Sequence, residues 1–153
     1  MMAWIDGEQK PVPDKLTNRI VQRVMPLDFL KSEYARKHHR LQVFAEKGVQ
    51  CVVPGCDCKG AFLAETAQMN MKTGTVSSIH IDLYTKDFQL MTVDHHIALG
   101  NGGSDRLENK FPMCERHNSK KGSKDPDTFY QNIALNGSQQ TAKKWRPKIN
   151  LAV

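Results

Sequence analysis

The sequence predicts a small α+β domain, and three observations carry this prediction. The chain has 153 residues, enough for one compact domain with extensions at its ends. Apolar residues recur at helical spacing in 27–47, whereas apolar and polar residues alternate in 78–84 as they do along a strand. Two pairs of cysteine and histidine residues, far apart in the sequence, offer four ligands for one metal ion.

The N-terminal part, 1–47, is expected to be an arm followed by a helix. Residues 1–26 are rich in proline and polar residues, which favour irregular structure with at most a short helix at 16–24. A proline suited to the first helical turn and a glycine at the other end delimit a helix over 27–47.

Residues 48–136 are expected to form the main domain, which opens with a tight cysteine-bearing turn at 51–60. Alternating polarity predicts strands at 78–84 and 89–93, and a further strand within 69–76.

A glycine-rich loop at 99–104 follows these strands. We then predict two short helices, Cys114–Lys121 and one that starts at Asp125–Pro126 and ends before Gly137. Residues 137–153 form a basic tail, which either is disordered or contacts a polyanionic partner.

The charge balance is basic, with a net charge of +6 and a pI of about 9.2. Such a balance suits a nucleic acid as partner. The polar face of the helix predicted at 27–47 is therefore either a solvated surface or a contact surface for the DNA backbone. Its basic residues are Lys31, Arg36, Lys37, Arg40 and Lys47.

The N-terminus lacks a basic segment followed by an apolar run, and no stretch reaches the roughly 18 apolar residues of a membrane span. The protein is therefore expected to be cytoplasmic, with reduced cysteines and no membrane association. Metal binding then explains the four cysteines better than disulfides do.

The ligand pairs are Cys51 with Cys56, around a Pro-Gly turn, and Cys114 with His117. Two such pairs complete the tetrahedron of a structural zinc site, whose binding free energy stabilises the fold. Cys58 is a spare thiol that can take the place of Cys56. The alternative is that the thiols are unrelated.

Asp94 and His95 stand together at the predicted end of a strand. In a regular strand their side chains face opposite ways, so joint action requires the strand to end or bulge there. Asp94 and Asn118 are oxygen ligands suited to Mg²⁺ or Mn²⁺, and His95 can act as a general base near neutral pH. Phosphodiester hydrolysis requires such a base and such a cation. Lysines that could neutralise flanking phosphates follow: Lys120, Lys121 and Lys124.

The segment 93–122, VDHHIALGNGGSDRLENKFPMCERHNSKKG, resembles the ββα-metal motif of the HNH endonucleases. The Asp-His pair, the two loop glycines, the later asparagine and the downstream zinc pair occur there in the same order. The resemblance implies a small zinc-stabilised ββα-metal domain with an N-terminal helical extension and a short C-terminal helix.

The resemblance also implies DNA hydrolysis to 5′-phosphate and 3′-hydroxyl ends, with His95 as the base and Mg²⁺ or Mn²⁺ on Asp94 and Asn118. Asn109 would tether the loop by hydrogen bonds. The insertion 59–86 resembles a version of the family common in bacteriophages, which implies a phage or bacterial source.

The chain departs from the family pattern at three positions. Ala98 replaces the usual proline, and His117 replaces the commoner cysteine. His96 stands where the family has isoleucine or valine, and is a second metal ligand, a DNA phosphate contact or a packed neutral histidine.

We therefore predict a metal-dependent HNH endonuclease that nicks or cuts DNA, with a second copy of itself or a phage or host protein as a further partner. One alternative is a non-catalytic zinc module that binds nucleic acid or protein, because the zinc and catalytic residues are separate sets. Another is a purely structural role in a larger assembly.

Overall fold

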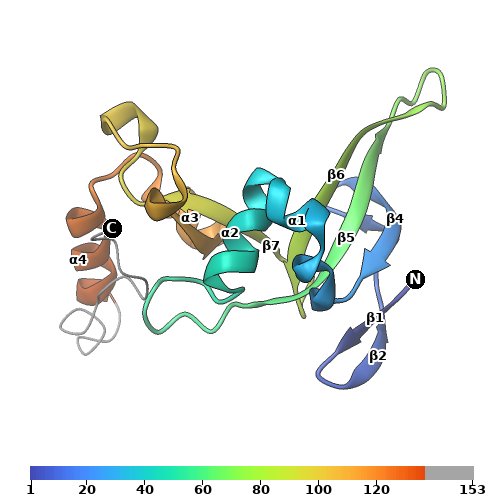
Figure 1. Cartoon of the computed structure of the whole chain (residues 1–153), viewed down its shortest axis with the longest axis horizontal. Coiled ribbons are helices and arrows are strands. Elements are labelled where there is room, and N and C mark those ends of the chain that lie inside the picture. Colours follow the sequence, from blue (N-terminus) through green and yellow to red (C-terminus); the bar gives the residue numbers. More distant parts are fainter. Residues whose placement is uncertain (137–153) are drawn as a thin grey trace.

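The computed structural model describes residues 1–136, so the basic tail predicted at 137–153 lies outside the described residues. The predicted α+β class is confirmed. An antiparallel six-stranded sheet has the order β3-β4-β5-β6-β7-β8, so its strands follow the chain as a meander. The sheet curls, and α1 and α2 pack over its middle (Figure 1). The strands are β1 Met2–Ile5, β2 Glu8–Pro11, β3 Lys15–Leu16, β4 Arg19–Met25, β5 Gly60–Met69, β6 Val76–Thr85, β7 Leu90–His95 and β8 Lys110–Cys114.

The prediction of an irregular N-terminal arm with a short helix was wrong, because this region forms four strands. Asp6 and Gly7 both have positive φ, as do Thr17 and Asn18. Two such residues in succession form the tight turns that join twisted antiparallel strands. The resulting hairpins are β1–β2 and β3–β4, and β4 then pairs along β5 in the main sheet.

The helix predicted at 27–47 is interrupted twice. A 3₁₀ helix spans Leu27–Lys31, α1 spans Glu33–Lys37 and α2 spans His39–Lys47. Ser32 and His38 have extended backbone at the two breaks, and the Ser32 hydroxyl accepts a hydrogen bond from the Ala35 amide at 3.2 Å. A serine that caps a new helix competes with continuation of the old one.

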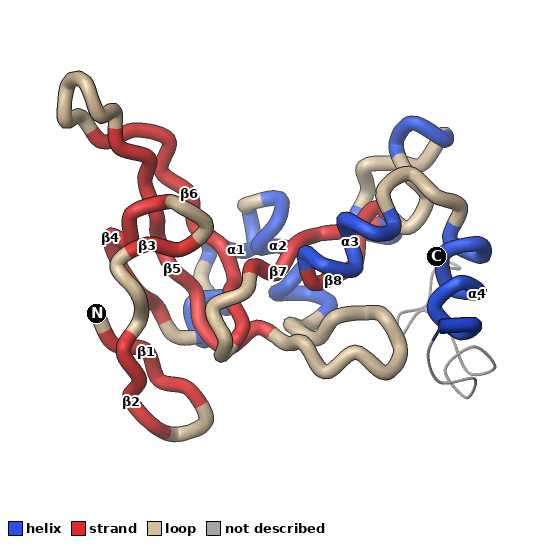
Figure 2. Tube along the Cα trace, turned by 180° about the vertical axis from the view of Figure 1, so that it is seen from behind, coloured by secondary structure: helices blue, strands red, loops and turns tan. Residues whose placement is uncertain are grey.

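Both faces of the sheet are covered. The helices pack on one face over a core that includes Leu41, Phe44 and Leu83. The β1–β2 hairpin packs on the other face over a smaller core that includes Ile5 and Tyr84. The second half of β6 is therefore buried on both sides, whereas its first half is exposed and projects with β5 beyond the body (Figure 2).

The neighbours of β7 position the candidate site. The ladder between β6 and β7 contains only Leu83 opposite Met91 and Tyr84 opposite Leu90, so the strands part beyond it. On its other side β7 pairs along its length with β8, the edge strand, where Pro112 is tolerated. Two further helices follow, α3 at Glu115–Lys121 and α4 at Pro126–Asn136. Within residues 1–136, no helix is both long and apolar enough to span a membrane.

Candidate metal and catalytic site

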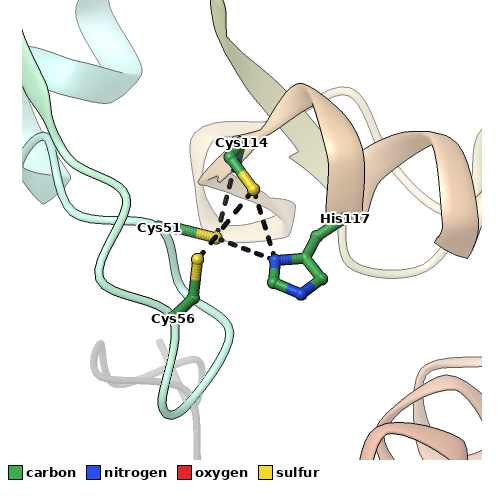
Figure 3. Close-up of side chains that lie close together, drawn as sticks. All are labelled: Cys51, Cys56, Cys114 and His117. Atoms are coloured by element: carbon green, nitrogen blue, oxygen red, sulfur yellow. Dashed lines mark hydrogen bonds between the residues drawn. The ribbon is translucent and has the colours of Figure 1, made fainter. Parts of the chain in front are cut away.

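Four side chains meet where β8 passes into α3, and they are the predicted quartet Cys51, Cys56, Cys114 and His117 (Figure 3). Their ligand atoms all lie within 4.8 Å of one another. The Cys56 and Cys114 sulfurs are 4.0 Å apart, and His117 Nδ1 lies 3.2 Å from the Cys114 sulfur. Zinc–sulfur bonds of about 2.3 Å place the sulfurs of a tetrahedron about 3.8 Å apart. The quartet could therefore hold a zinc ion.

Backbone hydrogen bonds shape the loop that carries the first two cysteines. The Cys56 amide donates to the Val53 carbonyl at 3.1 Å, which closes the turn, and Gly55 has a φ of 82°. The Val52 amide donates to the Pro112 carbonyl at 2.8 Å, which fixes the loop against β8. The two ligand pairs are thus brought together by backbone pairing as well as by side chains.

The chemistry of the quartet fits a soft or borderline metal ion. Thiolate sulfur and imidazole nitrogen are the ligands of structural zinc sites, although burial raises the pKa of the Cys51 thiol and so disfavours its thiolate unless a metal ion binds it. Burial, with the nearby charges of Arg116 and Lys120, lowers the pKa of His117, which favours the neutral imidazole that binds metals. Cys58 is outside the quartet, and burial and the neighbouring Cys56 raise its pKa to about 12.

Asp94 lies under α3 near the end of β7. Its carboxylate is 3% exposed, and its Oδ1 accepts a hydrogen bond from the Lys121 ammonium at 3.1 Å. Burial raises the pKa of Asp94, although the charges of Lys121 and His95 lower it. Its Oδ2 is buried and has no hydrogen-bond partner among the described residues. One oxygen of this carboxylate is therefore unsatisfied.

The prediction that Lys121 neutralises a DNA phosphate is wrong. Its side chain is 0% exposed, and its ammonium also donates to the carbonyls of His95 at 2.9 Å and His96 at 3.0 Å. The three acceptors compensate for the loss of water around the charge. Lys121 thus fixes the carboxylate and the backbone at the end of β7, whereas Lys120 and Lys124 are exposed.

Replacing Lys121 with methionine is expected to lower the free energy of unfolding by about 3–5 kcal/mol, because a buried carboxylate and two carbonyls lose their donor. Chemical denaturation measures this. Lys120→Met is the matched control, since the neighbouring side chain is exposed. Equal stability of the two variants would contradict the structural role of the buried ion pair.

Asn118 projects from α3 toward the same strand. Its amide nitrogen donates to the Thr92 hydroxyl at 2.8 Å and to the Val93 carbonyl at 3.3 Å, so its amide oxygen is not used in these bonds. Thr92 and Asp94 are two residues apart and face the same side of β7. The two predicted oxygen ligands of a divalent ion therefore lie on one face, each oriented by a partner of its own.

His95 lies on the opposite face. The β7–β8 register is regular up to His95, without a bulge, and the strand ends there. His95 Nε2 lies 2.8 Å from the Asp105 carboxylate, which also accepts from the Lys110 ammonium at 3.1 Å. The hydrogen bond from His95 and the one from Lys110 lower the pKa of Asp105. Reasoning from the sequence missed Asp105 and Lys110, although both are polar residues in the segment after His95.

The loop between β7 and β8 is tied by Asn109, the tethering role that the resemblance implies. Its side-chain nitrogen donates to the carbonyls of Ile97 at 2.9 Å and Ser104 at 2.7 Å, and its oxygen accepts from the Ile97 amide at 2.9 Å. Gly103 packs so closely that a Cβ there would overlap the Ile97 carbonyl oxygen.

Gly103→Ala is therefore expected to lower the free energy of unfolding by about 2–4 kcal/mol, because the loop must shift to relieve the overlap. Gly100→Ala is the control, since a Cβ at Gly100 meets no atom within 4 Å. Urea denaturation of both variants measures the difference, and equal midpoints would refute this account of the loop.

His96 packs edge-on against the Phe111 ring, with the ring centroids 5.7 Å apart. Burial, followed by the charge of Lys121, lowers its pKa. These surroundings favour the packed neutral histidine among the three roles predicted for His96.

Comparison of the chain with protein-family models, with curated proteins and with solved structures finds no match. A functional assignment therefore depends on the motif in the sequence and on the geometry of the two sites, a Cys₃His cluster beside α3 and a polar strand end at Asp94 and His95.

Proposed function

We propose that the protein is a metal-dependent endonuclease of the HNH type, which hydrolyses phosphodiester bonds in DNA. The observation that carries the proposal is the set of polar side chains at the end of β7. There a partly exposed histidine has a carboxylate partner, and the residue before it is a buried aspartate with an unsatisfied oxygen. The succession of β7, glycine loop, β8 and α3 supports the ββα-metal fold.

His95 is the general base of this proposal. Its Nε2 is held by the Asp105 carboxylate at 2.8 Å, which leaves Nδ1 as the basic nitrogen of the neutral ring. Asp105 thereby fixes the tautomer and stabilises the imidazolium that forms when water loses its proton. Lys121 fixes the backbone carbonyls of His95 and His96 and so positions the ring.

Asp94 on β7 and Asn118 on α3 fit a divalent cation, Mg²⁺ or Mn²⁺. Asp94 Oδ2 is a buried carboxylate oxygen without a hydrogen-bond partner in the part of the chain that the structure describes, and the Asn118 oxygen is a neutral hard donor. When bound, such an ion supplies positive charge to the phosphate and to the departing 3′ oxygen. The quartet of Cys51, Cys56, Cys114 and His117 holds a separate zinc ion with a structural role.

A plasmid nicking assay tests the proposal. Zinc-loaded protein is expected to convert supercoiled DNA to nicked or linear forms when Mg²⁺ or Mn²⁺ is added, and to leave it intact without them. DNA that stays supercoiled with every divalent ion tried would overturn the proposal. Salt-dependent DNA binding without cleavage would indicate the non-catalytic zinc module instead.

A further inference from the structure

A cavity of about 310 Å³ lies beside His95, in the gap where β6 and β7 part. His95 and the neighbouring Asp105 and Lys110 line one side of it. The N-terminus of α2 supplies His39 and Arg40 on another side. The N-terminal extension, to which the sequence motif assigns no role, therefore contributes a guanidinium and an imidazole to the surroundings of the candidate base.

Within residues 1–136, Arg40 makes one ion pair, with Asp82, which leaves other guanidinium donors available. Its Nη2 lies 3.1 Å from Asp82 Oδ1, and 45% of the Arg40 side chain is exposed against 12% for Asp82. A guanidinium has five N–H donors in a planar fork, which suits carboxylate and phosphate oxygens alike. Asp82 thus orients the guanidinium while part of it faces the cavity and solvent.

The residues that precede Arg40 in the sequence are mostly basic. The segment 36–40 reads Arg-Lys-His-His-Arg, without an acidic residue, and both Arg36 and Lys37 are exposed. Two carboxylates reach the cavity, and each already has a cationic partner, Arg40 for Asp82 and Lys110 for Asp105. The surface is therefore neutralised within the cavity. At the α1–α2 edge Glu33 pairs with Lys37 at 2.7 Å, and Arg36 adds an exposed positive charge.

We propose that His39 and Arg40 form a phosphate-binding edge that holds the DNA backbone on the cavity side of His95, with Asp82 opposing this contact. This inference rests on the proposed function, because it takes DNA as the ligand. It assigns the N-terminal extension to substrate binding. The contact is to the backbone, so it contributes affinity and register without base specificity.

Substituting Arg40 and substituting Asp82 should then change the affinity for DNA in opposite directions. Arg40→Gln is expected to weaken DNA binding about eightfold at about 0.1 M salt and to reduce the slope of log K against log salt by about 0.9, the effect of one phosphate contact. Asp82→Asn is expected to tighten binding about two- to threefold, the size of a Coulomb interaction between unit charges about 8 Å apart in water. His39→Gln should weaken binding in the same direction as Arg40→Gln.

The measurement is fluorescence anisotropy of a short labelled DNA duplex with the zinc-loaded, full-length protein, titrated at several salt concentrations without Mg²⁺ or Mn²⁺. The matched control is the ion pair Arg23–Glu65, 3.4 Å long, whose residues do not line the cavity and of which 55% of the Arg23 side chain is exposed. Arg23→Gln and Glu65→Gln are expected to leave affinity and salt slope nearly unchanged.

Opposite shifts for Arg40→Gln and Asp82→Asn support the phosphate-binding edge. Equal losses of affinity and melting temperature in both variants would show a merely structural ion pair and overturn it, as would unchanged affinity in both. If the wild type cuts plasmid but the shifts are absent, only this inference fails. If the shifts are opposite but the wild type cuts nothing with Mg²⁺ or Mn²⁺, the proposed function fails and the DNA-binding edge stands.

Discussion

His95→Ala is expected to lower the rate of DNA cleavage about a thousandfold, within the range that a general base contributes. The reason lies in the contacts of the His95 ring. The His95 ring is the imidazole whose Nε2 is held by Asp105, and 27% of its side chain is exposed toward the cavity where water can reach it. Single-turnover nicking of supercoiled plasmid with Mg²⁺ measures the rate without a contribution from product release.

The fold should survive this change, because the ring contacts the 66% exposed Asp105 and lies outside the hydrophobic cores. Zinc content and melting temperature of His95→Ala are therefore expected to match the wild type. His80→Ala is the control, since His80 is an exposed histidine on β6. A rate for His95→Ala within tenfold of the wild type would assign the base to another group.

Added imidazole offers a second check of the same role. The cavity of about 310 Å³ beside His95 is large enough to admit a free imidazole once the side chain is removed. We expect imidazole to restore part of the lost activity of His95→Ala and to leave the His80→Ala rate unchanged. A defect caused by misfolding would not respond in this way.

The metal quartet could be predicted from the sequence because its geometry is largely local. A Pro-Gly turn between Cys51 and Cys56 and a helical turn between Cys114 and His117 each bring two donors together within a few residues. Cys56 rather than Cys58 joins the quartet, a choice that depends on the turn closed by the Cys56 amide and the Val53 carbonyl. Spacing alone does not fix that choice.

The burial of Lys121 could not be predicted in the same way. Lysine is almost always exposed, and a buried ammonium depends on acceptors from distant residues, here Asp94 and the carbonyls of His95 and His96. The pairing of His95 with Asp105 likewise depends on how the glycine loop returns to β8. The cavity with Arg40 depends on the parting of β6 and β7, which no local pattern encodes.

The N-terminal strands were missed although a signal for them was present. Asp6-Gly7 is the residue pair that suits a two-residue hairpin turn, and it is flanked by Ile5 and Trp4 on one side and a polar strand on the other. The prolines at 11 and 13 favoured an irregular arm instead. In the structure Pro11 ends β2, where its missing amide proton breaks no central ladder.

The quartet has the largest expected effect on stability, and Cys56→Ser tests it against Cys58→Ser. The two cysteines are two residues apart in one loop, but only Cys56 has its sulfur within the ligand cluster, 4.0 Å from the Cys114 sulfur. Structural zinc in small domains contributes about 10–16 kcal/mol, which is comparable to the whole stability of a domain, about 5–15 kcal/mol.

Cys56→Ser is therefore expected to lose zinc and to unfold at or near room temperature, whereas Cys58→Ser keeps one zinc per chain and a melting temperature near that of the wild type. Metal analysis of the purified proteins and circular dichroism against temperature measure both effects. A strong zinc chelator should unfold the wild type as well, because the loop at 48–59 and α3 meet at the quartet. Equal zinc content in the two variants would show that Cys58 can replace Cys56. A wild type that melts at the same temperature with and without zinc would show that the metal does not stabilise the fold.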